Sequence, residues 1–277
     1  MLSTGSNFCV SVLMSVRNGL PHIEDAISSV LGQTQISLEL IVVDDGSDDG
    51  TSTLLGNLAS SDERLRVLHN EISLGLTRSL NRALSVATGR YVARIDHDDL
   101  WLERKLAQQV AYLDLHPEVG LLGTAYREAD IRGRWKRDPL LPLCRTDTEI
   151  RDALYRFNPF FHSSILIRRE LLVALGGYHE GYRYAQDYEL WTRVLSRTQA
   201  ATLPDVLCLR RVGDDNISYR RERAQRFNAL RAKLAWARLN GFSPRLLIPL
   251  VRDLAIVLAP RWLKAAIRSR LHATTAT

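Results

Sequence analysis

The stretch Leu38-Glu39-Leu40-Ile41-Val42-Val43-Asp44-Asp45-Gly46-Ser47 is an apolar run that stops abruptly at two carboxylates and a turn. An apolar run of this length, closed by turn residues, predicts a buried β-strand. In an open parallel sheet, ligands bind at the edge where the strands have their carboxyl ends. Asp44 and Asp45 are therefore candidates for accepting hydrogen bonds from a ligand. A structural role in the turn, with Ser47 or Asp48 capping the next helix, stays open beside it.

The residues on either side of this stretch alternate between apolar runs and amphipathic segments. The runs predict strands at 8–16, 65–68, 91–95, 119–124 and 163–167, and the stripes predict helices at 23–31, 76–87 and 102–113. This alternation is typical of βα units on a largely parallel sheet, so the sequence predicts an α/β fold. Residues 125–160 are expected to be irregular. A loop of that length is usually functional or mobile.

Composition sets broad limits on the class of protein. The chain has 277 residues, 45% hydrophobic and 25% charged, which is enough to bury a sizeable core. Its three cysteines, Cys9, Cys144 and Cys208, are far apart in sequence and predict no disulfide framework. The first residues lack the charged start of a secretory signal, and no stretch has the length of a membrane span. We therefore expect a cytoplasmic protein.

The net charge of +6 is unevenly distributed. From residue 210 onward there are 15 Lys/Arg and 4 Asp/Glu, a net +11, so the first 209 residues carry 22 and 27, a net −5. Residues 219–239 predict a basic helix with Phe227, Leu230, Leu234 and Ala237 on one face, and 261–271 a second one. These helices could cover the preceding α/β domain, or they could hold the protein on an anionic membrane surface. Nucleic-acid binding is disfavoured because no recognition motif accompanies the charge.

A second acidic group, Asp96-His97-Asp98-Asp99, directly follows the strand predicted at 91–95. Three carboxylates in four residues repel one another unless a cation lies among them. Oxygen ligands suit Mg²⁺ or Mn²⁺, which also chelate diphosphates. His97 is expected to point away from its two neighbours. A polar turn with Asp99 as a helix N-cap is the alternative.

A third acid, Asp187, lies in the predicted helix Tyr184-Ala185-Gln186-Asp187-Tyr188-Glu189-Leu190-Trp191. On a helix, Asp187, Trp191 and Val194 share one face. An acid beside an indole on an inward face should have a raised pKa, as a general base requires. A first-turn acid stabilised by the helix dipole is the structural alternative.

Taken in order, these motifs resemble the inverting family 2 of glycosyltransferases, over about residues 10–194. The resemblance rests on Val10 to Gly19, Ser29 to Thr34, Leu40 to Ser47, Asn70 with Leu74-Gly75-Leu76, Ala93 to Asp99, His162-Ser163-Ser164, and Gly176-Gly177-Tyr178 leading to Gln186 to Trp191. Each motif alone is common, whereas the ordered set is highly specific. The resemblance implies a GT-A fold with a catalytic domain at 1–212, divided into a nucleotide-binding half (8–100) and an acceptor half (101–212). Residues 213–277 would form a basic, helical C-terminal region.

The resemblance also implies roles for particular residues. Ser15, Arg17, Asn18, Asp44, Asp45 and Asp96 would bind the nucleotide sugar, with Asp45 on the uracil or thymine ring. Asp96, Asp98 and Asp99 would hold the divalent metal, and Asp187 would be the catalytic base. His162 and Trp191 are expected on the acceptor side, and residues 125–160 are our candidate for acceptor binding or a lid.

The implied reaction transfers a hexose or deoxyhexose from a UDP- or dTDP-linked donor to an acceptor hydroxyl, with inversion. The product would be a bacterial cell-surface polysaccharide, made on a glycan or lipid-linked glycan at the inner face of the cell membrane. Two departures from the family pattern are Arg17, where an aromatic is common, and Gln186, where the family usually has Glu. A catalytically degenerate relative and a sugar nucleotidyltransferase are the alternatives. A nucleotidyltransferase should carry a glycine-rich loop after the first strand, and Arg17-Asn18-Gly19-Leu20 offers one glycine.

Overall fold

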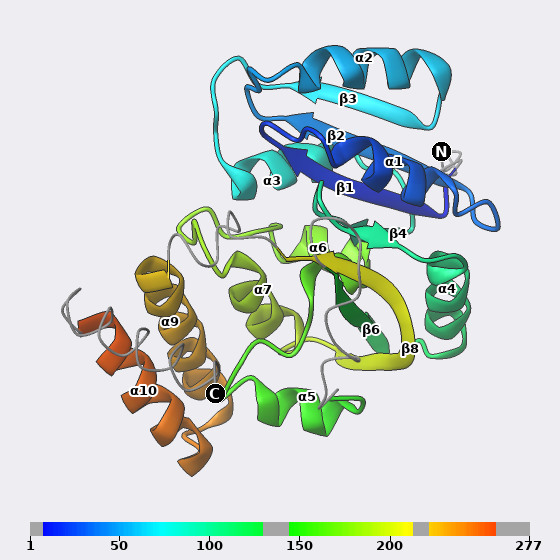
Figure 1. Ribbon diagram of the computed structural model, residues 1–277. Coiled ribbons are helices and arrows are strands. Elements are labelled where there is room, and N and C mark those ends of the chain that lie inside the picture. Colours follow the sequence, from blue (N-terminus) through cyan, green and yellow to red (C-terminus); the bar gives the residue numbers. More distant parts are fainter. Residues whose placement is uncertain (1–7, 130–143, 213–221, 259–277) are drawn as a thin grey trace, which may run out of the picture.

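One continuous sheet of eight strands organises the chain. The computed structural model describes residues 8–129, 144–212 and 222–258. Across the sheet the strands follow the order β3-β2-β1-β4-β7-β6-β8-β5 (Figure 1). The strands are β1 (Val10–Val16), β2 (Leu38–Asp44), β3 (Leu65–His69), β4 (Tyr91–Arg94), β5 (Leu100–Trp101), β6 (Val119–Ala129), β7 (Leu166–Arg168) and β8 (Gln199–Arg211).

The two halves of the sheet differ in strand direction. The first four strands pair in parallel, whereas β7 runs antiparallel to both of its neighbours, β4 and β6. Strand β8 then runs parallel to β6 and antiparallel to β5. The pairing of β4 with β7 joins the strands of the first half of the sheet to those of the second half through backbone hydrogen bonds.

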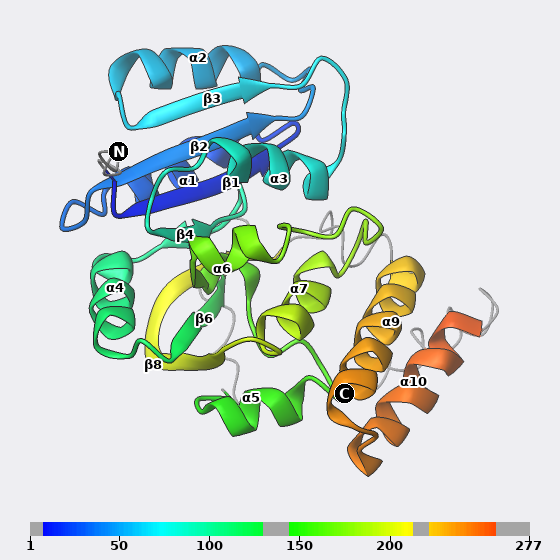
Figure 2. The ribbon, with the colours of Figure 1, turned by 180° about the vertical axis from the view of Figure 1, so that it is seen from behind.

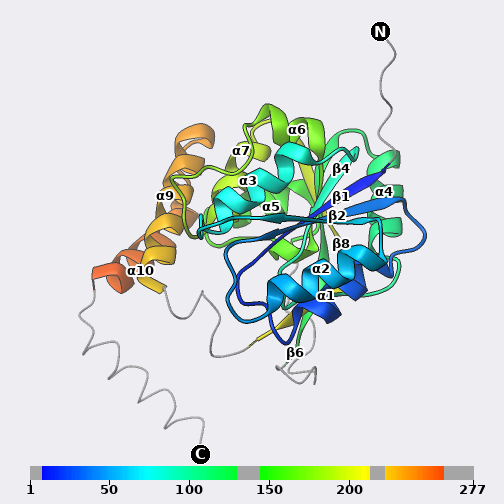
Figure 3. The same ribbon diagram turned by 90° about the horizontal axis from the view of Figure 1, so that it is seen from above.

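Helices cover both faces of the sheet (Figures 2 and 3). Alternation along β1 sends Val12 and Met14 into one hydrophobic core and Leu13 into the other. The first core is closed by α1 (Ile23–Leu31), α2 (Thr51–Ser61) and α4 (Lys105–Leu115). The second is closed by α3 (Leu76–Val86), α5 (Asp147–Ala153), α6 (Arg169–Ala174), α7 (Gln186–Val194) and α9 (Glu222–Asn240). The predicted stripe on α1 is confirmed, since Ile23, Ala26, Ile27 and Val30 are buried.

Several expectations for the second half were wrong. Residues 125–160 are not wholly irregular, because β6 continues to Ala129 and α5 begins behind a capping box formed by Thr146 and Glu149. Strands β5 and β8 were not predicted, and α4 begins after Leu102 because the short strand β5 precedes it. Residues 162–164 form a 3₁₀ turn, and the strand begins at Leu166. Residues 130–143 of the proposed lid lie outside the described part of the chain.

The C-terminal helices extend the second core outward. Helix α9 packs on α7 and buries Trp236, whose ring meets Tyr155 edge-on. A short 3₁₀ turn (Pro244–Leu246) leads into α10 (Leu247–Leu258), which lies on the far side of α9 (Figure 1). Phe227 was predicted on the packed face of α9 but is 52% exposed. The helix predicted at 261–271 lies outside the described residues, and no described helix has the length and apolarity needed to cross a membrane.

Candidate active site

A cleft of about 1220 Å³ opens at the carboxyl ends of β1 and β4. One side is lined by the chain after β1, by the loop before α3 and by the acidic residues after β4. Its other side is lined by residues preceding β7, by the start of α7 and by the last residues of β8. The predicted site residues on this lining are Ser15, Arg17, Asn18, Asp45, Asp96, Asp98, Asp99, His162 and Asp187. The structure thus brings nine of the predicted residues into one cavity.

Asp45 lies at the end of β2 with its carboxylate fully enclosed by hydrogen-bond donors. It accepts bonds from the side chains of Asn70, Ser73 and Ser79 and from the backbone N–H groups of Leu74 and Gly75, at 2.6 to 3.0 Å. Burial acts to raise the pKa of Asp45, but these hydrogen bonds outweigh it and hold the pKa below its ordinary value. The carboxylate therefore fixes the loop 70–75, which forms one wall of the cleft.

Asp44, the other acid of this turn, does not line the cleft. Its oxygens accept from the Ser47 backbone N–H at 3.0 Å and from the Ser52 hydroxyl at the first turn of α2. Next to it, Gly46 has a φ of +74°, a left-handed conformation that suits glycine, and its Cα faces the Ser73 backbone. Asp44 therefore has a structural role in the turn. The predicted cap by Ser47 or Asp48 is wrong, because α2 begins after Gly50, which has no side chain to cap the helix.

The chain after β1 is fastened to the same turn. Asn18 donates from its side-chain amide to Asp48 at 2.8 Å and accepts from the Asp48 backbone N–H at 3.0 Å. Ser15 is buried at the strand end, whereas Arg17 is exposed at the cleft. These contacts hold Asn18 in place and leave the Arg17 guanidinium available to a ligand.

Asp96, Asp98 and Asp99 form a compact acidic group after β4. One ligand oxygen from each lies within 4.8 Å of the others, a spacing that fits a single hard cation. Burial is the main cause that raises the pKa of Asp98, and it raises the pKa of Asp99 well above its ordinary value; the neighbouring carboxylates add to both. The energetic cost of gathering these charges is what a bound divalent ion would relieve. His97 lines the cleft but is not part of this group.

Two residues that we had given no role hold the acidic group in place. Arg94 lines the cleft and is 2% exposed, and its guanidinium donates hydrogen bonds to both carboxylate oxygens of Asp96. The hydroxyl of Ser163 accepts from the Asp96 backbone N–H at 3.0 Å and donates to Asp99. Asp96 is thus already paired with a cation, which leaves Asp98 as the least restrained oxygen donor of the three.

Asp187 faces this group from the N-terminal turn of α7. Asn158 donates its side-chain amide to Asp187 at 2.6 Å. Burial raises the pKa of the Asp187 carboxyl, against the hydrogen bonds from the Tyr188 backbone and Asn158 and the charge of Arg94. The predicted raised pKa is confirmed. Asn158, which had been missed, is 29 residues away in sequence and carries no motif that would have marked it.

The two residues predicted on the acceptor side differ in position. His162 lines the cleft and lies 2.8 Å from the Tyr178 hydroxyl through Nε2. Burial, reinforced by Arg94, lowers the pKa of His162 well below its ordinary value, so the ring is neutral. Trp191 is fully buried behind His162 and Phe160, packed edge-on against both rings, and does not line the cleft. Its role is to pack the core beneath the site.

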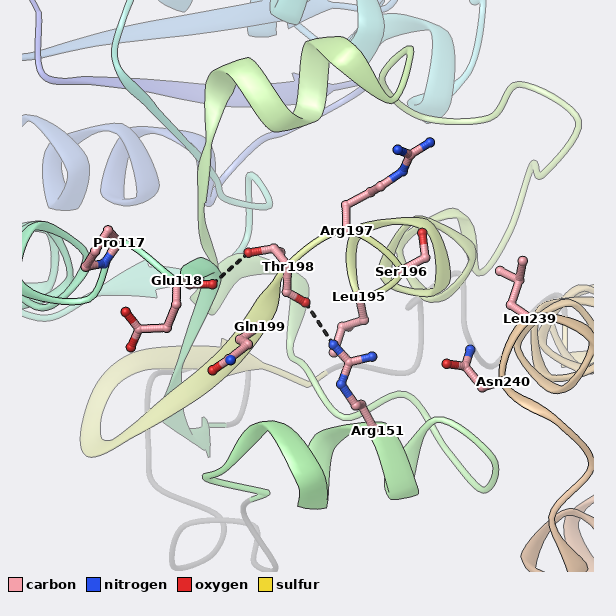
Figure 4. Close-up of a pocket in the computed structure, with 10 residues that line it drawn as sticks. All are labelled: Pro117, Glu118, Arg151, Leu195, Ser196, Arg197, Thr198, Gln199, Leu239 and Asn240. Carbon is pink, nitrogen blue, oxygen red and sulfur yellow. Dashed lines mark hydrogen bonds between the residues drawn. The ribbon is translucent and has the colours of Figure 1, made fainter.

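A second hollow, of about 770 Å³, lies between α5, the end of α7 and the end of α9 (Figure 4). Arg151 donates to the Thr198 carbonyl at 2.9 Å, and the Thr198 hydroxyl donates to the Glu118 carbonyl at 2.9 Å. Glu118 is the one acid on its lining. The described residues that line this second hollow include no cluster of acids like the one in the cleft. We therefore place the active site in the cleft.

Known proteins with similar sequences agree with this geometry. The family model of "Glycosyl transferase family 2" matches residues 11–176. An uncharacterized glycosyltransferase of Haemophilus influenzae is 31% identical over 217 residues, covering 72% of this chain but 64% of that protein. The amylovoran biosynthesis glycosyltransferase AmsE of Erwinia amylovora is 35% identical over 218 residues, covering 76% of this chain and 79% of AmsE. Over 107 residues, 39% of this chain and 42% of the relative, there is 39% identity to the Escherichia coli UDP-Glc:alpha-D-GlcNAc-diphosphoundecaprenol beta-1,3-glucosyltransferase WfgD.

A solved structure gives the same result for the fold. The mannosyltransferase PcManGT from Pyrobaculum calidifontis, in complex with GDP-Man and Mn²⁺, superposes with a TM-score of 0.66 at 26% sequence identity. The match covers 98% of this chain and 76% of PcManGT. Together with the family match over more than half of its length, this shows that the chain has the GT-A fold and belongs to glycosyltransferase family 2, among relatives that act in polysaccharide biosynthesis.

Proposed function

We propose that this glycosyltransferase takes a hexose or deoxyhexose from a UDP- or dTDP-linked donor and transfers it, with inversion, to an acceptor hydroxyl. One observation carries the proposal. A single cleft contains the acidic group after β4 and, facing it, Asp187, whose pKa is raised by burial. Charge stabilisation for a leaving diphosphate and a proton acceptor for an incoming hydroxyl are the two requirements of such a transfer.

The nucleotide would lie on the side of the cleft formed by β1 and the loop 70–75. Asp45 holds that loop with five hydrogen bonds, so its shape is set before a ligand arrives. Ser15 and the exposed guanidinium of Arg17 face the same space. PcManGT was solved with GDP-Man, a guanine nucleotide sugar, so the test below compares GDP with UDP and dTDP.

The acidic group fits a divalent metal by its chemistry. All three donors are carboxylates, the ligands preferred by Mg²⁺ and Mn²⁺, and they are close enough to share one ion. When bound, the metal would supply positive charge that neutralises the diphosphate as it leaves. We propose Asp98 as the principal ligand, with Asp99 beside it. Arg94 holds the Asp96 carboxylate through both of its oxygens.

Asp187 would act on the acceptor. Its raised pKa suits a carboxylate that takes the proton of the acceptor hydroxyl while that oxygen attacks the anomeric carbon. The new carbon–oxygen bond forms on the face opposite the diphosphate as the bond to the diphosphate breaks, so the configuration inverts in one displacement. Asn158 keeps the Asp187 carboxylate oriented through its hydrogen bond.

For the acceptor, we propose a glycan or lipid-linked glycan destined for a cell-surface polysaccharide. WfgD acts on a sugar joined to diphosphoundecaprenol, which is a lipid-linked acceptor of this kind. The reaction would then take place at the inner face of the cell membrane. His162 would meet the acceptor as a neutral ring that exchanges hydrogen bonds without adding charge.

The proposal is tested by thermal shift with UDP, dTDP and GDP, each with and without Mn²⁺. We expect a Mn²⁺-dependent rise in Tm with UDP or dTDP, which is lost in Asp98→Asn because that substitution removes the least restrained ligand. Glu103→Gln is the matched control, since it removes an exposed acid near α4 that does not line the cleft. A folded wild-type protein that shows no shift with any nucleotide would contradict the donor assignment, and a shift with GDP alone would contradict the choice of base.

A further inference from the structure

Helix α10 is turned with its apolar side toward solvent. Its outer face, defined here as Leu247, Ile248, Val251, Leu254 and Leu258, follows the spacing of a single helical stripe. These five side chains are between 45% and 81% exposed. An amphipathic helix of a globular protein normally buries such a stripe against the core, so this face needs an occupant.

The orientation of α10 is fixed by charge on its inner face. Asp253 is 1% exposed and forms an ion pair with Lys233 of α9, itself 2% exposed. Arg226 of α9 reaches the same carboxylate at 3.1 Å, and Arg252 reaches it at 3.3 Å. Rolling the helix to bury its apolar stripe would strand a buried carboxylate and a buried ammonium without partners, which is strongly unfavourable. The outward stripe is therefore a stable feature of the fold.

The charge of the two C-terminal helices selects among possible occupants. Residues 222–258 contain seven Lys/Arg against Glu222 and Asp253, a net +5. Two of the seven, Arg226 and Lys233, pair with Asp253 on the inner face, and Arg252 also reaches it. Arg252 flanks the stripe with its side chain 54% exposed. The sequence beyond, 259–277, has four more Lys/Arg and no Asp or Glu. A second copy or the chain's own C-terminal segment would set like charges against each other, whereas an anionic surface complements them.

We propose that the outer face of α10 lies in the headgroup region of an anionic lipid bilayer, with the helix parallel to the membrane plane. Rows of aliphatic side chains flanked by arginine are the pattern of helices that bind in this way. The short connection between Asn240 and Leu247 turns α10 back along α9, and Asp253 contacts Arg226 near the start of α9, next to Gln225, which lines the cleft. Resting on the proposed function, this places the acceptor side of the cleft at the lipid surface.

The test is cosedimentation of the full chain with vesicles of phosphatidylcholine, with and without phosphatidylglycerol. We expect binding that needs the anionic lipid and weakens as salt is raised, because the charge contribution is screened. Ile248→Ser with Val251→Ser should weaken it at least about tenfold, since two inserted side chains are lost. Arg252→Gln should weaken the anionic-lipid preference. The matched control is Leu115→Ser, an equally conspicuous aliphatic residue, 78% exposed on α4, which should bind as wild type.

Two results would overturn the proposal. One is a double variant that binds vesicles as well as wild type. The other is a wild-type protein that is a dimer in analytical ultracentrifugation while the double variant is a monomer. That result would assign the face to a second copy of the chain. The nucleotide-dependent thermal shift, measured without vesicles, should be the same in wild type and double variant. Its absence from both would refute the donor assignment alone, because vesicle binding is measured independently of it.

Discussion

The two sides of the cleft hold their carboxylates in opposite ways. On the side formed by β1 and the loop 70–75, Asp45 accepts five hydrogen bonds and its pKa lies below the ordinary value, even though burial acts to raise it. On the opposite side, at the start of α7, Asp187 has one side-chain partner, Asn158, and burial raises its pKa. The first arrangement makes a permanent anion that supports a loop. The second makes an acid that can exchange a proton, which is the property that catalysis needs.

The largest expected effect comes from Asp187→Asn. The amide keeps the shape and can still accept from Asn158, but it cannot take a proton, so turnover should fall by roughly 10²- to 10⁴-fold while nucleotide binding is retained. Initial rates and the nucleotide thermal shift measure the two quantities. The control is Glu189→Gln on the same helix. Glu189 pairs with Arg193 at 2.7 Å, so this variant should lose stability but keep its turnover. Full turnover in Asp187→Asn would show that Asp187 is not the base and would contradict the functional contrast between Asp187 and Asp45.

A smaller effect, on stability, is expected from Asp45→Asn. In this variant the new amide group would point N–H bonds at groups that are themselves hydrogen-bond donors, so some of the five hydrogen bonds would be lost. A hydrogen bond to a charged group contributes about 1.5–3 kcal/mol to stability. The free energy of unfolding in urea should fall by about that amount, and nucleotide binding should weaken with it because the loop 70–75 loses its anchor. Asp187→Asn should show the reverse sign at neutral pH, since it removes a charge that is costly to bury. Equal stability changes in the two variants would contradict the assignment of opposite roles.

The smallest effect separates the two acids by pH. Turnover needs ionised Asp187, so it should fall as the pH drops through the raised pKa. Asn158→Ala removes a donor that lowers this pKa and should move that acid limb to higher pH, as a profile of kcat against pH would show. Because its folded pKa is raised, Asp187 favours folding below its unfolded pKa and loses that contribution as the pH rises through the folded value. Asp45 behaves oppositely: its contribution is present above the ordinary carboxyl pKa and is lost as the pH falls through its lowered pKa. An acid limb that stays in place in Asn158→Ala would show that Asp187 is not the titrating base.

The same contrast explains what the sequence could predict. The acids after β2 and β4 were found because each follows an apolar run directly, and such runs are local patterns. Their supports were not found. Arg94 ends β4, two residues before Asp96, but no motif marked it as the partner of that carboxylate, and Ser163 and Asn158 reach the acids from other elements. Asp44 and Trp191 were assigned to the site by proximity in sequence, but each is turned away from the cleft and packed elsewhere.

Among the secondary structures, the errors have particular physical causes. The capping box at Thr146 and Glu149 was a readable indication of α5 that we missed. Strand β8 was missed because Pro204 and Asp205 interrupt its apolar alternation, and its pairing with β6 shifts register opposite that point. The inverted packing of α10 could not be predicted from periodicity, which gives the stripe but not the side of the helix that faces the core. Asp253 decides that side through partners on another helix.

The hydrogen-bonded junction of β4 with β7 has a consequence for how such a chain can diversify. The pairs Tyr91 with Arg168, Val92 with Ile167 and Ala93 with Leu166 fix the spacing of the two halves by strand register rather than by a flexible connection. Substitutions of the side chains that line the cleft can therefore change which ligands bind without changing the distance between the two sides of the cleft. In related chains we expect the pairing of β4 with β7 to stay the same while the residues on the cleft lining vary.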